Sequence, residues 1–436
     1  MLTIKTDIEN KSWLIYILEE FRNINLANFD IEILSLSETS LNTNIISYVN
    51  TPTDGLSIYS SNEEMPTNTI EYLQDNLFIH ENTKSKNFSI NYDLLWNAFI
   101  FLSRYEEYLS EENEKYIYSY SLNHPRSDKR SFDIPIVNVL FNELELFIKK
   151  NFPKCTFNNK KEPIINLSHD VDYIEKTIQL RLKQTAFNGY NTLKSITNPK
   201  QFIKNISKTF KFAFSTPSYW CFDYWTKLEK KHNQRSTFYI YVKNAKKDFK
   251  SWLIDPSYDI KLNKKLQEKL KELKNNGFEI GLHGSYNSAK DFEKLKEEKI
   301  ILENVLGFKV TKTRQHWLNY FESITPDSHN RLFETDSTLG WNDRIGFRSG
   351  CASKFRPYDF KNNKTFNYYI IPQIIMDSNV YDYTKDEQIF EKTKNMIKLS
   401  KNISKTTHIS ISWHQRVCSS DYNWNKFYEE LLDEVF

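Results

Sequence analysis

The sequence predicts an α/β protein in which a smaller α/β domain precedes a larger one built on parallel strands. From residue 163 onwards, strand-like apolar runs alternate with helical patterns. This alternation is typical of a parallel sheet with helices outside it, either open or closed into a barrel. The segment FPKCTFNNKKEP at 152–163 is polar and has a proline near each end, which indicates a boundary. We therefore predict one domain over residues 1–158 and a second over 159–436.

The first domain is predicted to combine helices with short strands. Apolar residues recur at helical spacing in 13–21, 91–109 and 134–152, and this spacing is typical of helices that bury one face. The run IEILSLS at 31–37 has the composition of a strand. Helices and strands mixed in this way indicate an α/β domain.

The second domain contains a series of strand-like runs. They lie at 163–170, 236–242, 278–283, 310–316, 367–375 and 408–413. Helical patterns lie between most of them, notably at 262–275 and 291–306. Residues 186–218 are rich in Lys and Asn and interrupt the alternation, so we predict an insertion there.

Composition restricts the class of protein. Of the 436 residues, 39% are hydrophobic and 26% are charged, a balance that excludes a disordered or membrane-embedded chain. No apolar run approaches the ~20 residues of a membrane span, and the first residues lack the apolar core of a signal peptide. The four cysteines are widely separated, without a CxxC pair, so neither a zinc knuckle nor a disulfide framework is predicted. We expect a cytoplasmic protein with reduced thiols.

Charge is divided unequally along the chain. Residues 1–158 hold 13 basic and 23 acidic residues, whereas 159–436 hold 46 basic and 33 acidic ones. Either the two parts attract each other within the chain, or the basic part meets an acidic substrate or surface. The sequence has no base-stacking motif and no Gly-rich phosphate loop, so no nucleic-acid partner is predicted.

Histidines gather at the ends of the predicted strands. His169, His283, His316 and His414, four of the nine histidines, fall there. The carboxyl ends of the strands converge on the face of an α/β barrel that carries its chemistry. Imidazole nitrogens and carboxylate oxygens suit Zn²⁺ or a similar divalent ion, which activates a bound water. These residue types therefore indicate metal-assisted hydrolysis.

Two carboxylates end the first of these strands. Asp170 and Asp172 lie two residues apart, and because successive side chains of a strand alternate in direction, both would face one side. One could bind the metal while the other takes a proton from water. A histidine opposite them could protonate the leaving group.

Several of these segments resemble motifs of the polysaccharide deacetylase family, carbohydrate esterase family 4. SHDVD at 168–172 is similar to the family's strand ending in Thr-Phe-Asp-Asp, and GFEIGLH at 277–283 resembles its Gly-His-Glu-Ile-Gly turn with the first metal histidine. The segments at 225–242, 302–317 and 408–415 are similar to other strands of the family. The resemblance covers about 163–417. It implies a distorted seven-stranded (β/α) barrel and a metal-dependent enzyme that removes acetyl groups from sugars.

The resemblance implies a metal set, with two departures from the family's pattern. The family's metal aspartate directly follows its base aspartate, but here Val171 intervenes, so Asp172 is expected to take the metal role. The family's second metal histidine falls at Asn287, and Asn is a poor zinc ligand; His316 could replace it from the neighbouring strand. We therefore predict that Asp172, His283 and His316 bind a divalent metal, with Asn287 in reserve. Zn²⁺ is the first candidate, with Co²⁺, Ni²⁺ and Fe²⁺ as alternatives.

The resemblance also implies catalytic roles. Asp170 is the expected general base, Arg314 the cation that keeps it ionised, and His414 the general acid. Segment 336–350 occupies the place of the family's variable fourth motif, which lines the site. The candidates for substrate contact there are Asp336, Trp341 and Arg348.

The predicted function is metal-dependent deacetylation, the hydrolysis of a carbon–nitrogen bond other than a peptide bond. The expected substrate is an N-acetylated sugar or glycan intermediate, including an anionic or carrier-linked one that would suit the basic surplus. Two alternatives stay open: an amidohydrolase for a non-sugar amide on the same barrel, and an inactive barrel that acts as a carbohydrate-binding or interaction module. FIFLSRYEEYL at 99–109 resembles an uncharacterised domain found ahead of such domains in bacterial proteins, and this resemblance names no activity.

Overall fold

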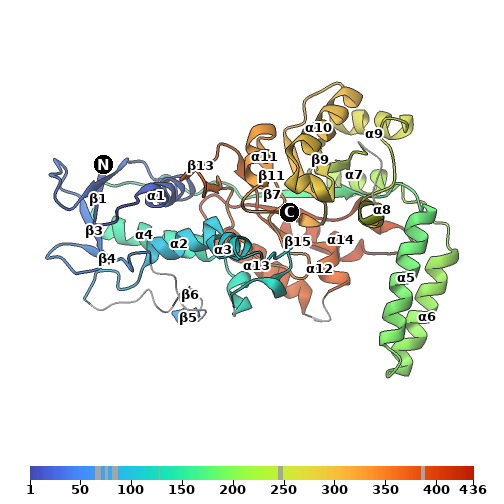
Figure 1. The fold of residues 1–436 in the computed structure, drawn as a ribbon, viewed down its shortest axis with the longest axis horizontal. Helices are drawn as coiled ribbons and strands as arrows, with labels where there is room; N and C mark the ends of the chain where they lie inside the picture. Colours follow the sequence, from blue (N-terminus) through green and yellow to red (C-terminus); the bar gives the residue numbers. More distant parts are fainter. Residues whose placement is uncertain (64–69, 74–76, 81–86, 127, 244–248, 384–387) are drawn as a thin grey trace. The chain divides into compact units, whose positions relative to one another are not determined.

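The computed structural model describes residues 1–436 apart from 64–69, 74–76, 81–86, 127, 244–248 and 384–387 (Figure 1). These residues form two compact units. The first unit joins Met1–Asn166 to Leu318–Ile411, and the second unit joins Leu167–Trp317 to Ser412–Phe436. This division by compactness cuts the chain differently from the expected boundary at 158/159, which stays a prediction.

A parallel sheet with helices forms the amino-terminal part of the first unit. Its order is β2-β1-β3-β4, and neighbouring strands run parallel. The strands are β1 (Leu2–Thr6), β2 (Ile31–Ser35), β3 (Ile45–Val49) and β4 (Ser57–Tyr59). The helices that bury a face in its core are α1 (Ser12–Asn25), α2 (Leu94–Ser103) and α4 (Ile136–Asn151). The α/β character predicted for this region is confirmed.

The core of the first unit also takes in side chains from the later part of the chain. Tyr320, Leu339, Cys351, Phe355 and Tyr368 belong to the same buried cluster as the residues of α1, α2 and α4. Burial of apolar surface is the main force that holds a domain together. This shared core explains why 318–411 belong to the first unit.

The remaining elements of the first unit are short helices and strands. β5 pairs with β6 and β12 with β13, both antiparallel. These elements are β5 (Ile70–Leu73), β6 (Leu77–His80), α3 (Tyr105–Glu112), η3 (Ser121–Asn123), η4 (Lys129–Asp133), α11 (Thr325–Leu332), β11 (Thr335–Asp336), β12 (Tyr358–Asp359), β13 (Lys364–Thr365), β14 (Tyr369–Ile370), β15 (Gln373–Met376), α12 (Asp377–Tyr381) and α13 (Ile389–Ile403).

The single helix predicted over 91–109 is two helices, α2 and α3. They meet at Arg104, whose φ of 60° and ψ of 41° lie in the left-handed region, a conformation that costs roughly 1–2 kcal/mol. The buried Arg104 guanidinium donates from Nε and Nη2 to the two carboxylate oxygens of Glu322, at 2.6 and 2.8 Å. We attribute the break to this ion pair. Neither Gly nor Pro marks the position, so the apolar spacing could not predict it.

An eight-stranded sheet has the order β14-β11-β10-β9-β8-β7-β16-β15. Its pairs β7–β8, β8–β9 and β9–β10 run parallel. The strands not yet given are β7 (Ile164–Val171), β8 (Thr237–Tyr241), β9 (Glu279–Gly284), β10 (Lys312–Gln315) and β16 (His408–Ser412). The predicted α/β architecture with a parallel sheet is confirmed.

The strand predicted over 367–375 is divided into β14 and β15. Ile371 and Pro372 lie between them. Proline has no backbone N–H to donate to a sheet ladder, which explains the interruption.

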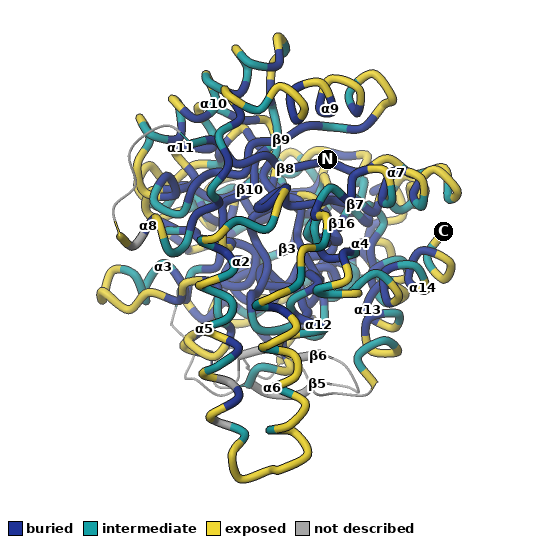
Figure 2. The backbone as a smooth tube through the Cα atoms, turned by 90° about the vertical axis from the view of Figure 1, so that its right-hand side faces the viewer, coloured by how far each residue is buried: buried dark blue, intermediate teal, exposed yellow. Residues whose placement is uncertain are grey.

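Helices accompany the buried strands of the second unit. Figure 2 shows β8, β9 and β10 largely as buried tube, whereas buried, intermediate and exposed residues alternate along α9 and α10. The predicted helices at 262–275 and 291–306 are confirmed as α9 (Lys264–Asn275) and α10 (Phe292–Leu306). The others are α7 (Phe222–Lys231), α8 (Phe249–Ile254), η5 (Tyr286–Lys290), η6 (His316–Leu318), η7 (Gln415–Cys418) and α14 (Lys426–Val435).

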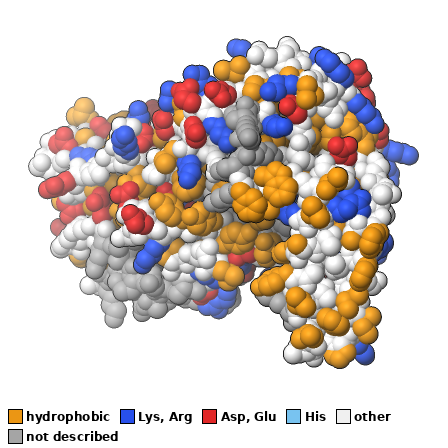
Figure 3. All heavy atoms as spheres, turned by 45° about the vertical axis from the view of Figure 1, so that its right-hand side comes forward, with side chains coloured by type: hydrophobic (Ala, Val, Ile, Leu, Met, Phe, Trp, Pro, Cys, Tyr) orange, Lys and Arg blue, Asp and Glu red, His pale blue; other side chains and the backbone are white. Residues whose placement is uncertain are grey.

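The region near 186–218, whose being an insertion stays a prediction, lies in a hairpin of two helices, α5 (Ile178–Lys194) and α6 (Pro199–Phe214), which lie side by side (Figure 1). The Thr192 and Thr209 hydroxyls lie 3.2 Å apart, and Asn205 Nδ2 donates to Ser195 Oγ at 3.0 Å. Hydrophobic side chains are exposed along the hairpin (Figure 3). Within the described residues, no helix has both the length and the hydropathy of a transmembrane span.

Candidate metal centre

Successive polar side chains of strand β7 point to opposite faces of the sheet. Ser168 Oγ and Asp170 Oδ1 both accept from the guanidinium of Arg314, at 2.9 and 2.8 Å. His169, between them, instead lies 2.8 Å from the Trp413 carbonyl through Nδ1 and 2.7 Å from Glu229 Oε1 through Nε2. The strand therefore presents Ser168 and Asp170 to Arg314, and His169 to other partners.

Three buried side chains from the ends of three strands, β7, β9 and β10, converge in the second unit. Asp172 follows β7, His283 belongs to β9, and His316 follows β10. Each offers one ligand atom, and these atoms all lie within 4.8 Å of one another. Asp172 Oδ1 lies 3.4 Å from His283 Nε2 and 3.8 Å from His316 Nε2.

The hydrogen bonds made by Nδ1 of each histidine ring indicate whether the Nε2 atoms of this triad can bind a cation. His283 Nδ1 lies 2.9 Å from the Arg314 carbonyl oxygen, and His316 Nδ1 lies 3.0 Å from Asp255 Oδ1. Carbonyl and carboxylate oxygens accept, so both Nδ1 atoms carry the proton and Nε2 of each neutral ring presents a lone pair. Asp172 Oδ1 and His283 Nε2 are buried and have no hydrogen-bond partner. Lone pairs that face one another favour a positive charge between them, so the residues present fit a divalent ion.

The second oxygen of Asp172 faces a guanidinium group and an imidazole ring. Arg416 Nη1 donates to Oδ2 at 2.8 Å, and His414 Nε2 lies 3.3 Å from it. Burial raises the pKa of Asp172, but the imidazoles of His414 and His283 and the guanidinium of Arg416 outweigh burial and hold the pKa well below its usual range. Asp172 is therefore a carboxylate at neutral pH, the form that binds metal.

The two histidines of the triad differ in proton affinity. Burial lowers the pKa of His283, but Asp170 and Asp172 outweigh it, so the pKa lies above its usual value. Burial lowers the pKa of His316 in spite of Asp255. His316 is thus held neutral, as a metal ligand must be.

Asp170 is buried in an ion pair. Arg314 donates to Asp170, and it also donates from Nη1 to Ser412 Oγ at 2.7 Å. Its guanidinium lies 4.4 Å from the ring centre of Tyr239. Burial raises the pKa of Asp170, and the charge of Arg314 outweighs burial, so the pKa is lowered. Asp170 is ionised and able to accept a proton.

Asn287, the reserve ligand, has a partner of its own. It lies in η5, and its Nδ2 donates to Ser251 Oγ at 3.1 Å. The triad is formed by His316 in this structure.

The three predicted substrate contacts lie in the first unit. Asp336 Oδ1 accepts from the Thr338 backbone N–H at 2.8 Å. Trp341 is buried with its ring centre 4.8 Å from that of Phe132. Their role in substrate contact stays a prediction.

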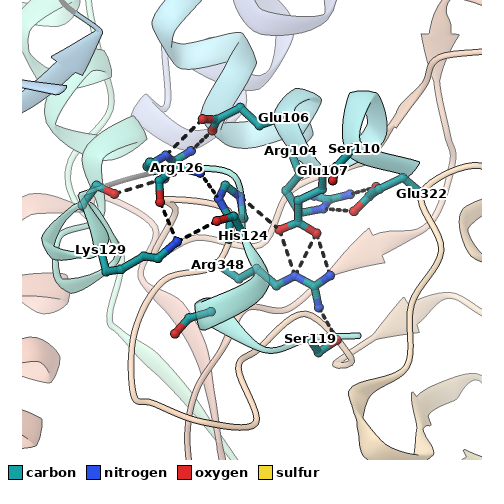
Figure 4. A network of polar contacts seen from close by, with 12 residues as sticks. Arg104, Glu106, Glu107, Ser110, Ser119, His124, Arg126, Lys129, Glu322 and Arg348 are labelled. Carbon is teal, nitrogen blue, oxygen red and sulfur yellow. Dashed lines mark hydrogen bonds and ion pairs between the residues drawn. The ribbon is translucent and has the colours of Figure 1, made fainter. Parts of the chain in front are cut away.

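Arg348 belongs to a network of buried ion pairs in the first unit (Figure 4). It donates from Nε to both carboxylate oxygens of Glu107 at 3.1 Å and from Nη2 to Oε2 at 2.6 Å. Nη1 donates to Ser119 Oγ at 2.6 Å. These contacts give Arg348 a structural role, and its predicted contact with substrate stays a prediction.

Two residues of the centre were missed in the sequence. Arg416 lies two positions after His414, beyond β16 and within η7, so no strand end marks it. Asp255 lies in a loop between α8 and α9, and its carboxylate also accepts from the Tyr286 backbone N–H at 2.9 Å. No strand pattern marks such a loop residue.

Comparisons with known proteins give one family match and several similar structures. The model of a family of unknown function, DUF7033, matches residues 2–153. None of the curated proteins matches the chain.

The similar solved structures are of polysaccharide deacetylase type. A Mycobacterium smegmatis protein assigned as a polysaccharide deacetylase is 14% identical, with a TM-score of 0.38, over 64% of this chain and 86% of that one. A protein from Pseudomonas aeruginosa with the same assignment is 13% identical, with a TM-score of 0.35, over 62% and 83%. A CE4 family pseudoenzyme from Bacillus anthracis is 9% identical, with a TM-score of 0.29, over 63% and 60%. We rest the functional proposal on the side chains of the second unit.

Proposed function

We propose that the second unit is a metal-dependent hydrolase that removes an acetyl group from an N-acetylated sugar or glycan. One observation carries the proposal. Asp172 Oδ1 and His283 Nε2 are buried without a hydrogen-bond partner, and both belong to a triad whose ligand atoms lie within 4.8 Å of one another. A buried polar atom without a partner costs about 1–3 kcal/mol, so such a set is explained best by an ion that binds there.

Asp172, His283 and His316 would hold the ion. A divalent metal at this position lowers the pKa of a water molecule and polarises a carbonyl group. Asp255 and the Arg314 carbonyl fix the two imidazole rings through their Nδ1 atoms, which orients both Nε2 lone pairs.

Asp170 would act as the base. It takes a proton from the attacking water as the water oxygen forms a bond to the acetyl carbon. Arg314, at 2.8 Å, keeps the Asp170 carboxylate ionised before the reaction. Its hydrogen bonds to Ser168 and Ser412 hold the guanidinium in place.

His414 would act as the acid. Its ring follows β16 and is partly exposed, with Nε2 3.3 Å from Asp172 Oδ2. It supplies a proton to the amide nitrogen as the carbon–nitrogen bond breaks, so the products are acetate and a free amine. The resemblance of the surrounding motifs to polysaccharide deacetylases supports an N-acetylated sugar as the substrate, including an anionic or carrier-linked one.

A second candidate function rests on Arg416. Its guanidinium lies 2.8 Å from Asp172 Oδ2, and an arginine on a metal-binding aspartate competes with the ion for its charge. Together with Val171 and Asn287 at altered motif positions, this contact favours an inactive barrel that binds a carbohydrate or a protein.

Elemental analysis of freshly purified protein separates the two candidates. We expect about one divalent ion per chain in the wild type and none in His283→Ala. His232→Ala is the matched control, because His232 caps the end of α7 and should leave the metal content unchanged. A metal-free wild type after incubation with Zn²⁺, Co²⁺, Ni²⁺ and Fe²⁺ in turn would contradict the hydrolase and favour the binding module.

Acetate release identifies the substrate. The metal-loaded protein is incubated with N-acetylated sugars and, separately, with acetylated amines that carry no sugar. Release from sugars alone supports the proposal. Release from the simple amides alone would instead assign an amidohydrolase with a non-sugar substrate.

A further inference from the structure

The hairpin of α5 and α6, residues 178–214, exposes apolar side chains along both helices. On α5, exposed Ile178, Leu182 and Leu193 recur at helical spacing. On α6, Ile203, Phe210 and Phe214 form a second stripe and are 67%, 63% and 76% exposed. Figure 3 shows hydrophobic side chains along the hairpin. Large apolar residues exposed in contiguous rows mark a surface that binds something.

The charge of the hairpin has one sign. Residues 178–214 contain seven Lys and Arg and no Asp or Glu. Four lysines of α6 are exposed and follow the helix at intervals of four, four and three residues, next to the apolar stripe: Lys200, Lys204, Lys208 and Lys211. An apolar stripe bordered by lysines is typical of helices that lie in the interface of an anionic membrane.

The hairpin is fixed to the part of the second unit that carries the metal centre. Tyr173, directly after Asp172, packs with Leu180 of α5 and Phe212 of α6 in one buried cluster. Lys176 Nζ, just before α5, lies 2.8 Å from Asp421 Oδ2. The base of the hairpin is therefore tied to the segment that follows β7.

A pair of aromatic residues continues the apolar surface beside α5. Gln179 of α5 donates to the backbone carbonyl of Trp252 in α8. Phe249 and Trp252 are both exposed and stack with ring centres 6.3 Å apart. Exposed Trp and Phe are the residues that insert at the level of lipid headgroups.

We propose that the α5–α6 hairpin binds the surface of an anionic phospholipid membrane. Its apolar stripes enter the boundary between headgroups and acyl chains, and its lysines face the anionic phosphates. A second copy of the chain fits less well, because two hairpins with seven positive charges each and no negative charge would repel each other. A nucleic acid could stack on Phe210 and Phe214 but would gain little from the other four side chains of the stripes, which are Leu and Ile and offer no stacking surface.

Vesicle flotation with the full-length protein tests the proposal. The probes are equimolar phosphatidylglycerol–phosphatidylcholine vesicles and phosphatidylcholine vesicles alone. We expect binding to the first and much weaker binding to the second. Lys204→Gln/Lys208→Gln should weaken binding roughly 30-fold, because each lysine contributes about 1 kcal/mol near an anionic surface. Phe210→Ser/Phe214→Ser should weaken it by about tenfold or more.

Matched variants on another exposed helix serve as controls. Ile300→Ser and Lys296→Gln lie on α10 and are exposed or partly exposed, so they should leave vesicle binding unchanged. Equal binding to both kinds of vesicle, or equal loss in the α10 variants, would overturn the proposal. Absence of vesicle binding together with concentration-dependent dimerisation in sedimentation would overturn it as well and assign the surface to a second copy.

Discussion

Each unit of this protein buries a cluster of polar and charged side chains. The two clusters differ in whether their members have hydrogen-bond partners within the protein. In the first unit, Arg104, Arg126 and Arg348 each hold a carboxylate, which belongs to Glu322, Glu106 and Glu107 respectively (Figure 4). Three positive charges meet three negative ones. In the second unit, two histidines direct their Nε2 atoms at one oxygen of Asp172, and two of these buried atoms have no hydrogen-bond partner.

This difference shows that buried polar side chains can either stabilise the fold or leave atoms able to bind a ligand. A buried ion pair with two or more hydrogen bonds is closed, because nothing further can bind to it without breaking it. A buried set of lone pairs is open, because it becomes favourable only when a cation arrives. Similar residue types therefore hold the first unit together and form the proposed metal site in the second.

The largest expected effect lies in the second unit. Asp170→Asn removes the proposed base and should lower turnover about 10²- to 10⁴-fold, while the metal content stays unchanged because the triad is intact. Acetate release and elemental analysis measure the two quantities on one sample. Near-normal turnover in both Asp170→Asn and His414→Ala would remove these residues from the mechanism.

Substitutions in the ion-paired cluster of the first unit, the closed cluster, should lower the stability of the protein. Glu107→Gln leaves the buried Arg348 guanidinium without its carboxylate, and we expect the free energy of unfolding to fall by about 3–5 kcal/mol, measured by urea denaturation. His283→Asn in metal-free protein is the comparison from the open cluster. It leaves no buried charge without its partner, because Arg416 still donates to Asp172 at 2.8 Å, so the loss should be less than half as large. Equal losses would mean that the two clusters do not differ as described.

The clusters should respond to pH in opposite directions. Burial lowers the pKa of His124, in the first unit, to about 3. Its folded-state pKa lies below its unfolded value, so its contribution to stability is complete above about pH 6.5 and is lost as the pH falls, by about 3 kcal/mol at pH 4. His124→Asn should flatten this acid limb in denaturation at several pH values.

His283 should show the reverse behaviour in metal-free protein. Its pKa is raised by Asp170 and Asp172, which outweigh burial. Its contribution is therefore complete below the unfolded pKa of about 6.5 and is lost as the pH rises through the raised folded value. A metal-free protein whose stability shows no such alkaline loss, relative to His283→Asn, would argue against a raised pKa for this ring.

The smallest expected effect is on metal affinity, and it comes from the hydrogen bond between Asp255 and His316 Nδ1 in the open cluster. Asp255→Asn weakens the bond that orients His316, and metal affinity should fall about 10- to 100-fold, measured by competition with a chelator of known affinity. Asp259→Asn is the matched control, since its carboxylate accepts from the Lys261 backbone N–H near the surface. Unchanged affinity in Asp255→Asn would show that the ring is held by packing alone.

The sequence predicted the parts of the fold and site that depend on local periodicity. Alternation along β7 predicted a common side for Asp170 and Asp172, and strand ends marked His283 and His316. The break at Arg104 and the grouping of Tyr320 and Phe355 with the amino-terminal core depend on pairings across hundreds of residues. Arg416 and Asp255 reach the centre from the short helix η7 and from a loop, neither of which has a periodic pattern long enough to predict it.

The ligands of the triad come from positions 172, 283 and 316, far apart in the chain. An ion that binds all three would act as a cross-link between segments that are distant in the unfolded protein. Because such an ion binds only the folded form, a free concentration one hundred times its dissociation constant would add about 2.7 kcal/mol to the stability. The supply of metal in the cell would then set both the activity of this protein and how much of it escapes proteolysis.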